Sequence, residues 1–250
     1  MNNLIWYYPK TKSECIKYFN DGFRPHGGGT FLVKTSLNIK GLFNLSDIDE
    51  FKILSNDGNH FNIGSAITFS DAGSWLNLVS PDNYLSKALL NAASTPLRNR
   101  ITIGGSLCSL PKWSDIAAPL LCANAIIQTA ESDKEISLEE YFYDRKIRKN
   151  TLVSSIKIPV SNLNGTYYRF TLTGFDYQIF SVAVSESNSI LRCAVNGNKN
   201  GPSLFTGTST EILNETEQKL IFSPERGFSS EYIKNRALTE IKKLVKIAGA

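Results

Sequence analysis

The feature that most constrains this chain is a pair of glycine-rich segments that lie far apart in the sequence. The first, residues 27–30, reads Gly-Gly-Gly-Thr, and the second, residues 102–106, reads Thr-Ile-Gly-Gly-Ser. Consecutive glycines indicate a backbone that needs unusual freedom or that another group approaches closely. Such segments present unobstructed backbone N–H groups, and the flanking hydroxyls complete a shell suited to phosphate oxygens. Two of them in one domain suit a pyrophosphate better than a single phosphate.

These glycine segments do not match the common nucleotide-binding motifs. Neither contains the G-x-x-x-x-G-K-[ST] pattern of P-loop nucleotide hydrolases. Neither contains the G-x-G-x-x-G pattern of a Rossmann dinucleotide site. Because turns are the commonest use of glycine pairs, two ordinary tight turns stay open as the alternative to a phosphate site.

Charge and composition exclude several functional classes. The 250 residues carry 27 basic and 23 acidic side chains, and the net charge of +4 is too mild for a nucleic-acid binder. Hydrophobic residues make up 42% of the chain, as in globular rather than disordered proteins. His26 and His60 are the histidines available to a Ser-His-Asp triad, and no G-x-S-x-G motif accompanies them. The cysteines are scattered, so we expect reduced, buried thiols rather than an iron–sulfur or zinc site: Cys15, Cys108, Cys122 and Cys193.

The hydropathy pattern predicts neither a secreted protein nor a membrane protein. The first nine residues lack the basic region and the long apolar core of a signal peptide. The most apolar stretch, residues 116–127, is interrupted by Pro119 and Asn124 and is too short to span a bilayer. We therefore expect a cytoplasmic protein with no membrane partner and no nucleic-acid partner.

Hydrophobic periodicity predicts helices and strands that alternate along the chain. Helical spacing marks residues 12–19, 70–78 with Ser70 as the cap, 84–93, 114–121, 137–142 and 230–247. Extended patterns mark residues 42–54 with a turn, 61–68, 125–129, 152–158, 167–171, 181–185 and 190–195. The polar, turn-rich residues 161–165 indicate a domain boundary.

The residues around the second glycine segment carry a family resemblance. Arg98 and Asn99 precede Thr-Ile-Gly-Gly-Ser, and Asp115 follows it. This arrangement resembles the Arg-Asn, Thr-Ile-Gly-Gly-Asn and Asp pattern of the flavin-binding medium subunits of molybdenum hydroxylases, the xanthine dehydrogenase and carbon monoxide dehydrogenase class. Weaker matches run in the same order along the chain: residues 28–30 resemble the family's Ala-Gly-Gly-Thr-Asp loop, residues 63–68 its Ile-Gly-Ala-x-x-Thr strand, and residues 228–237 its Ser-x-x-Tyr-Arg segment.

The resemblance implies an α+β fold in two parts. Residues 1–160 would form a two-lobed FAD-binding domain of the PCMH type. Residues 165–250 would form a smaller sheet-and-helix C-terminal domain. The cofactor implied is FAD, with its flavin ring near the junction of the two domains.

The resemblance also implies which residues would bind FAD. The two glycine loops would hold the pyrophosphate, and Asp115 would accept hydrogen bonds from the ribose hydroxyls. Ser109 would line the cofactor channel, Val153 matches a position that packs on the flavin ring, and Ile179 matches one beside the isoalloxazine. A charge at a helix N-terminus is the alternative role for Asp115. The cofactor-binding residues implied in this way are Gly27, Gly28, Gly29, Thr30, Phe31, Leu32, Thr102, Gly104, Gly105, Ser106, Ser109, Asp115, Val153 and Ile179.

The function implied is that of a flavoprotein electron-transfer subunit, an FAD-dependent oxidoreductase component that works within a hetero-oligomer. In such a subunit the protein supplies position and electrostatics while the cofactor carries the redox chemistry. Electrons would arrive from an iron–sulfur subunit that is fed by a molybdopterin subunit. They would leave the flavin to NAD, a quinone or oxygen. No residue is assigned a catalytic or metal-binding role.

Departures from the family pattern support a second hypothesis. Phe31 stands where the family has an acidic residue, and Phe170 lies near a family lysine that approaches the flavin, for which Arg169 could substitute. Residues 111–113, Pro-Lys-Trp, replace smaller residues. The alternative is thus a structural or assembly subunit that keeps the fold with weak or no flavin binding. A stand-alone flavin oxidase would need a larger substrate domain, and an unrelated glycine-turn protein would not match along the whole chain.

Overall fold

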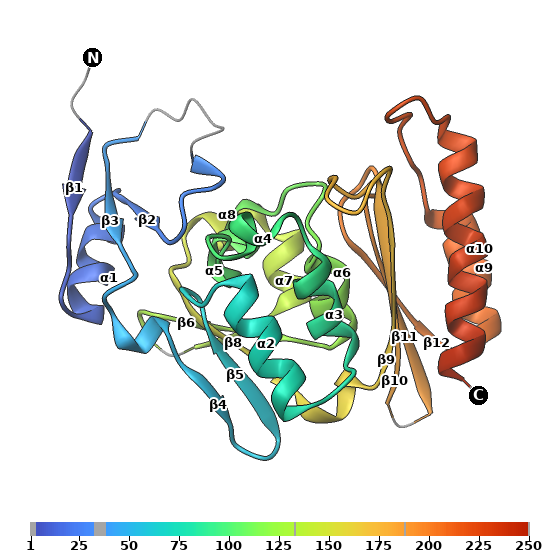
Figure 1. Ribbon diagram of the computed structural model, residues 1–250, viewed down its shortest axis with the longest axis horizontal. Coiled ribbons are helices and arrows are strands. Elements are labelled where there is room, and N and C mark those ends of the chain that lie inside the picture. The colour runs from blue at the N-terminus through green and yellow to red at the C-terminus, as the bar shows by residue number, and fades with distance from the viewer. Residues whose placement is uncertain (1–3, 33–38, 133, 188, 250) are drawn as a thin grey trace.

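Three β-sheets follow one another from one end of the molecule to the other in the computed structural model (Figure 1). The structure describes residues 4–32, 39–132, 134–187 and 189–249. Most of the helices surround the middle sheet, and the long C-terminal helix covers the outer side of the last sheet (Figure 1). None of the described helices is both long and apolar enough to cross a lipid bilayer.

The N-terminal sheet is a small parallel sheet with the strand order β1-β3-β2. Its strands are β1 (Ile5–Tyr7), β3 (Gly41–Asn44) and β2 (Arg24–His26). Helix α1 (Lys12–Asn20) begins after Thr11, whose side chain accepts a hydrogen bond from the backbone N–H of Glu14. Cys15 of this helix is fully buried in a core that it shares with Phe43 of β3. The first glycine segment follows directly after β2.

The middle sheet is antiparallel and has the strand order β4-β5-β8-β6-β7. Its strands are β4 (Leu54–Asn56), β5 (His60–Gly64), β8 (Val153–Pro159), β6 (Ile126–Thr129) and β7 (Glu135–Ser137). Residues 153–156 of the central strand β8 are all buried. Two of them are serines, and their hydroxyls donate hydrogen bonds to Gln128 of β6, which satisfies the buried polar groups.

The helices around the middle sheet follow from apolar faces and clear caps. They are α2 (Phe69–Val79), α3 (Tyr84–Asn91), α4 (Thr95–Arg98), α5 (Ile103–Ser109), α6 (Ala117–Cys122), α7 (Leu138–Tyr143) and α8 (Arg145–Lys149), with short 3₁₀ turns η2 (Asp49–Phe51) and η3 (Val160–Leu163). Side chains before most of these helices accept hydrogen bonds from first-turn N–H groups: Thr68, Asn83, Thr102, Ser137 and Asp144.

The C-terminal unit, residues 165–249, is an antiparallel sheet with two helices. Its strand order is β12-β11-β10-β9, from β9 (Gly165–Phe170), β10 (Phe180–Ser187), β11 (Ile190–Asn196) and β12 (Ser203–Gly207), followed by α9 (Ser209–Lys219) and α10 (Ser230–Ala248). Side chains alternate between the two faces. Val182 and Val184 pack in the core that contains α10, while Ala183 joins the core of the middle sheet. Helix α6 packs against β10.

The α+β prediction is confirmed, and three local predictions are corrected. Helix α2 begins at Phe69 with Thr68 as its cap, not at Ser70, because the Thr68 hydroxyl reaches the N–H of Asp71 at 3.1 Å. Residues 42–54 form β3, the turn η2 and the start of β4 rather than one strand with a turn. The second glycine segment is the first turn of helix α5 rather than a loop.

The fourth difference lies between α5 and α6. Helix α6 begins at Ala117 rather than at residue 114. Side chains of the C-terminal unit donate hydrogen bonds to the carbonyl groups of Lys112, Ser114 and Asp115. These long-range bonds hold residues 112–115 as a connecting loop outside the helix.

Candidate active-site pocket

A cavity of about 500 Å³ lies where the two glycine segments meet. Its walls come from the N-terminal sheet, from the helices of the middle region and from the loop before α6. Most of its lining surface is apolar, with a few polar groups among the apolar ones, as is typical of a site for a cofactor or a small molecule. The cavity is therefore the candidate functional site.

The first glycine segment packs against the residues just before α5. A Cβ atom on Gly28 would overlap the carbonyl oxygen of Arg100, so no other residue fits there without moving the backbone. The Arg100 guanidinium donates from Nε and Nη2 to the carbonyl of Gly28, at 3.3 and 3.1 Å. Within the described part of the chain, the backbone N–H groups of residues 27–30 donate no hydrogen bond. The first segment thus brings unused donors to the pocket wall.

The second glycine segment contributes in a different way from the one predicted. The backbone N–H groups of residues 103–106 already have acceptors: Ile103 donates to Ile67, Gly104 to Ser65, Gly105 to the Thr102 hydroxyl and Ser106 to the Thr102 carbonyl. The expectation of free N–H groups on this segment is therefore corrected, because the segment folds as a capped helical turn. A Cβ on Gly104 would lie 2.6 Å from that of Ser65, so this glycine permits close packing of α5.

Ser65 supplies a polar atom that has no partner within the described chain. Its side-chain oxygen is buried and makes no hydrogen bond there, and the residue lines the pocket. Its backbone is fixed on both sides, since its N–H donates to Ser154 and its carbonyl accepts from Gly104. Because buried hydroxyls without partners are rare in folded proteins, the Ser65 hydroxyl is a candidate contact for a polar atom of a ligand.

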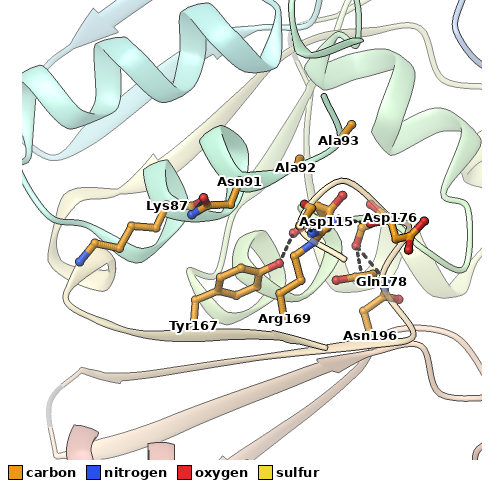
Figure 2. A network of polar contacts seen from close by, with 12 residues as sticks. Lys87, Asn91, Ala92, Ala93, Asp115, Tyr167, Arg169, Asp176, Gln178 and Asn196 are labelled. Atoms are coloured by element: carbon orange, nitrogen blue, oxygen red, sulfur yellow. Dashed lines mark hydrogen bonds and ion pairs between the residues drawn. The ribbon is translucent and has the colours of Figure 1, made fainter. Parts of the chain in front are cut away.

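Asp115 lies at the pocket wall and is held by the C-terminal unit (Figure 2). Nε of Arg169 on β9 is 2.6 Å from Oδ1 of Asp115, and both side chains are about nine-tenths buried. The same guanidinium donates to the carbonyls of Gly174 and Asp176. The Tyr167 hydroxyl donates to the Asp115 carbonyl at 3.4 Å. Arg169 is therefore committed to Asp115 and does not line the pocket as the substitute for a flavin-facing lysine.

The electrostatics of Asp115 follow from its burial. Burial raises its pKa from 3.8 to about 6, because the carboxylate loses water when it leaves the surface. The Arg169 guanidinium opposes this effect and favours the charged form. At neutral pH Asp115 is thus ionised, although it titrates not far below that pH.

Another part of the pocket is strongly basic. Its lining includes Arg24 of β2 and three residues of α8: Arg145, Arg148 and Lys149. Arg148 donates to the Phe142 carbonyl at 2.7 Å. Among the described residues, no carboxylate pairs with any of these four. Like charges gathered without counter-charges favour an anionic ligand.

Aromatic side chains also line the cavity. Phe31 follows the first glycine segment, while Trp113 and Tyr177 come from two different loops. The rings of Trp113 and Tyr177 lie 5.0 Å apart between centroids and are tilted by 43°. Each of these two residues is nearly two-fifths exposed. The pocket therefore offers flat apolar surfaces beside its polar groups, which suits a ligand that contains aromatic rings.

The structure brings nearly all of the residues predicted to bind FAD to this one cavity. Both glycine segments, Phe31, Leu32, Ser109, Asp115 and Val153 line it. Ile179 does not: it is 1% exposed and packs in the core of the C-terminal unit. Cys15, Cys122 and Cys193 are buried free thiols as expected, whereas Cys108 is exposed and lines the pocket, which corrects the expectation for that residue.

Several pocket residues escaped the sequence-based prediction. Ser65 lies in a segment that was matched only as a strand, and its role depends on its contact with Gly104. The basic residues at 145–149 could have been recognised in the sequence as a potential anion-binding segment, since four of the five residues are cationic. Nothing in the sequence around Tyr177 indicated that it lines the pocket, because its position there depends on how the C-terminal unit packs against the rest of the chain.

Comparisons with known proteins point to one family and one fold. A sequence profile described as "FAD binding domain in molybdopterin dehydrogenase" matches residues 2–161. No curated protein sequence matches the chain. The fold is similar to that of a chain of a reconstituted CO dehydrogenase from Oligotropha carboxidovorans, with a TM-score of 0.85, 18% identity, and coverage of 99% of this chain and 98% of that chain.

Other solved structures have the same fold. A chain of a CO dehydrogenase from Hydrogenophaga pseudoflava that lacks the Mo-pyranopterin moiety has a TM-score of 0.85 and 16% identity, and covers 98% of this chain and 96% of its own. A chain of quinoline 2-oxidoreductase from Pseudomonas putida 86 has a TM-score of 0.81 and 16% identity at the same coverage. At these identities the likeness establishes the shared fold.

Proposed function

Because the chain belongs to the family of FAD-binding domains in molybdopterin dehydrogenases, we propose that it is the flavoprotein electron-transfer subunit of a molybdenum hydroxylase complex. Its partners in this proposal are an iron–sulfur subunit and a molybdopterin subunit. Electrons pass from the iron–sulfur clusters to FAD in this chain and then to NAD or another acceptor. The similarity in fold to chains of CO dehydrogenase and quinoline 2-oxidoreductase supports this assignment.

The observation that carries the proposal is the pocket between the two glycine segments. Its chemistry fits FAD at several points. The unused N–H groups of residues 27–30 suit a pyrophosphate, and the partnerless hydroxyl of buried Ser65 suits a polar atom of the cofactor. The cations of Arg24 and α8 compensate the two negative charges of FAD. The aromatic lining suits its ring systems.

The residues of this chain bind and orient the cofactor rather than react with the substrate. The first glycine segment would hold the pyrophosphate, Asp115 would accept from a sugar hydroxyl, and Val153 would pack against a ring. The tight packing of Gly28 and Gly104 fixes the pocket walls before the cofactor enters, which lowers the cost of ordering them on binding. When bound, FAD supplies the redox chemistry between one-electron and two-electron carriers.

The experiment that tests the cofactor is an absorption spectrum of the purified protein. Denaturation should release FAD at about one molecule per chain, and a colourless preparation should take up added FAD. A matched variant, Ser65→Ala, removes the partnerless hydroxyl and should bind FAD more weakly, because a buried polar contact of this kind is worth about 1 kcal/mol.

The partners are tested by co-expression with iron–sulfur and molybdopterin subunits of the molybdenum hydroxylase class. A stable three-subunit complex whose FAD is reduced by the substrate of the molybdenum subunit would support the electron-transfer role. Assembly of that complex without bound FAD would instead favour a structural subunit, the alternative that Phe31 in the first glycine region suggests. Absence of both FAD and assembly would refute both roles.

A further inference from the structure

We propose that Arg169 is a positioning residue for the cofactor pocket, through which FAD binding and docking of the C-terminal unit stabilise each other. The inference rests on the proposed function, because it takes FAD as the occupant of the pocket. Arg169 does not line the pocket, and its strand β9 is distant in sequence from both glycine segments.

The first step is the geometry of the carboxylate. Oδ1 of Asp115 is occupied by Arg169, while Oδ2 accepts no hydrogen bond from the described residues. Asp115 belongs to the pocket wall, so its second oxygen is the acceptor left for a cofactor hydroxyl. Arg169 cannot turn away from it, since its other nitrogens donate to the carbonyls of Gly174 and Asp176 (Figure 2).

The second step is the loop that carries Asp115. Side chains of the C-terminal unit donate hydrogen bonds to three carbonyl groups of this loop, those of Lys112, Ser114 and Asp115. Asn196 of β11 donates to the carbonyls of Lys112 and Ser114, each at 2.9 Å, and Gln178 donates to Ser114 at 2.6 Å. Tyr167 donates to Asp115 at 3.4 Å. The position of Asp115 in the pocket thus depends on the docked C-terminal unit.

The third step connects this loop to the second glycine segment. The side-chain oxygens of Ser106 and Ser114 lie 3.5 Å apart, and both residues line the pocket. A continuous set of polar contacts therefore runs from the cofactor pocket through residues 114 and 115 to the strands of the C-terminal unit. Whatever binds the pocket through Asp115 favours the docked arrangement, and docking in turn favours that binding by the same free energy.

The charged groups around Asp115 predict the pH dependence of this coupling. Arg169 is the cation that faces it, and Tyr167 is a neutral phenol whose pKa burial raises well above its usual value. The neighbouring ion pairs Lys112–Glu225 and Arg226–Asp176 are formed by residues that do not line the pocket. With Arg169 in place, the pKa of Asp115 is about 6. Loss of the guanidinium removes the interaction that favours the carboxylate, so the same titration moves to higher pH.

The experiment is a fluorescence titration of the apo-protein with FAD between pH 5 and 8.5, on the wild type, Arg169→Gln and Arg192→Gln. Arg192 is the matched control, since it also reaches from the C-terminal unit to the middle region. It donates to the carbonyls of Leu121 and Cys122, which lie outside the pocket. Circular dichroism and thermal melts of the apo-proteins establish that each variant is folded.

We expect wild-type affinity to rise with pH through about 6 and then to level off, because FAD binds the ionised form of Asp115 more tightly. Arg169→Gln should weaken FAD binding about tenfold or more at pH 7.5, the loss expected for one charge-assisted contact. Its pH midpoint should also move upward. Arg192→Gln should keep the wild-type midpoint even where it lowers the melting temperature.

Equal affinities and equal midpoints for Arg169→Gln and the wild type would overturn the inference while leaving FAD binding intact. A wild type that takes up no FAD would refute the proposed function itself, and the inference with it. If Arg169→Gln does not fold, hydrogen exchange on the wild type tests the coupling between FAD binding and docking of the C-terminal unit. Added FAD should slow exchange of the amides around residues 178–181 and 194–198, which lie outside the pocket. Unchanged exchange there would refute the coupling.

Discussion

At the scale of single residues, the glycines of the pocket are important because they have no side chain. Gly28 lies so close to the Arg100 carbonyl that a Cβ would overlap it, and Gly104 allows α5 to pack against Ser65. These positions are determined by contacts between segments that are distant in sequence. The two glycine segments therefore shape one pocket together. Among the described residues, the N–H groups of residues 27–30 find no acceptor, whereas those of residues 103–106 do.

Gly28→Ala should reduce both FAD occupancy and stability. The added methyl group collides with backbone, which cannot rotate away, so the first glycine segment must shift and unfolding should become easier by about 1–3 kcal/mol. Chemical denaturation and FAD titration measure the two effects. Gly174→Ala is the control, because its Cβ would meet nothing within 4 Å and its φ is not in the left-handed region. Equal behaviour of the two variants would contradict the steric role of Gly28.

At the scale of elements, helix α8 gives the pocket its charge. Asp144 caps this short helix by accepting hydrogen bonds from Lys146 and Ile147, which fixes its first turn. Arg145, Arg148 and Lys149 then line the cavity, whereas Lys146 does not. A short basic helix thus increases the attraction of the pocket for an anionic ligand.

Lys149→Glu should weaken FAD binding, and the loss should shrink as salt is added, because the interaction is electrostatic and is screened by ions. A change of up to several-fold at low salt is expected from the reversal of one exposed charge. Titrations at low and at high ionic strength measure it. Lys146→Glu makes the same charge change on the same helix outside the cavity and should have a smaller effect. Identical losses in both variants would show that only net charge matters.

At the scale of the whole molecule, Asp115 ties the stability of the fold to pH. The pKa of this carboxyl is raised by burial to about 6 in the folded protein, above the ordinary value of 3.8. The folded state therefore holds the proton more tightly than the unfolded state does. This contribution is complete below about pH 4 and is lost as the pH rises through about 6.

The apo-protein should accordingly gain stability over its Asp115→Asn variant when the pH falls from 7 to 4, by about 3 kcal/mol at most. Unfolding free energies of both proteins, measured in denaturant across this pH range, test whether the stability difference changes in this direction. Asp57→Asn provides a contrast, because backbone N–H groups of His60 and Asn59 lower the pKa of the exposed Asp57 carboxyl. The stability that Asp57 contributes is lost on acidification, so the wild type should lose stability relative to Asp57→Asn as the pH falls. The same slope for Asp115→Asn and the wild type would contradict the raised pKa.

The amino-acid sequence by itself determined the features that depend on neighbouring residues. The hydrophobic periodicity predicted most of the longer helices and strands, and the two glycine segments indicated a place for a phosphate group. The two-part α+β fold and the role of Asp115 were implied by the family resemblance of the sequence. These signals are local: a cap, a glycine or an apolar stripe requires only the next few residues to have its effect.

Only the tertiary structure decided what each of these residues contacts. It capped the second glycine segment into a helix, placed Ile179 in a core away from the pocket and brought Arg169 to the carboxylate of Asp115. It also turned the cations of α8 toward the cavity. These outcomes depend on how three sheets and their helices pack, since contacts between distant segments form only when the apolar faces of whole elements are buried together.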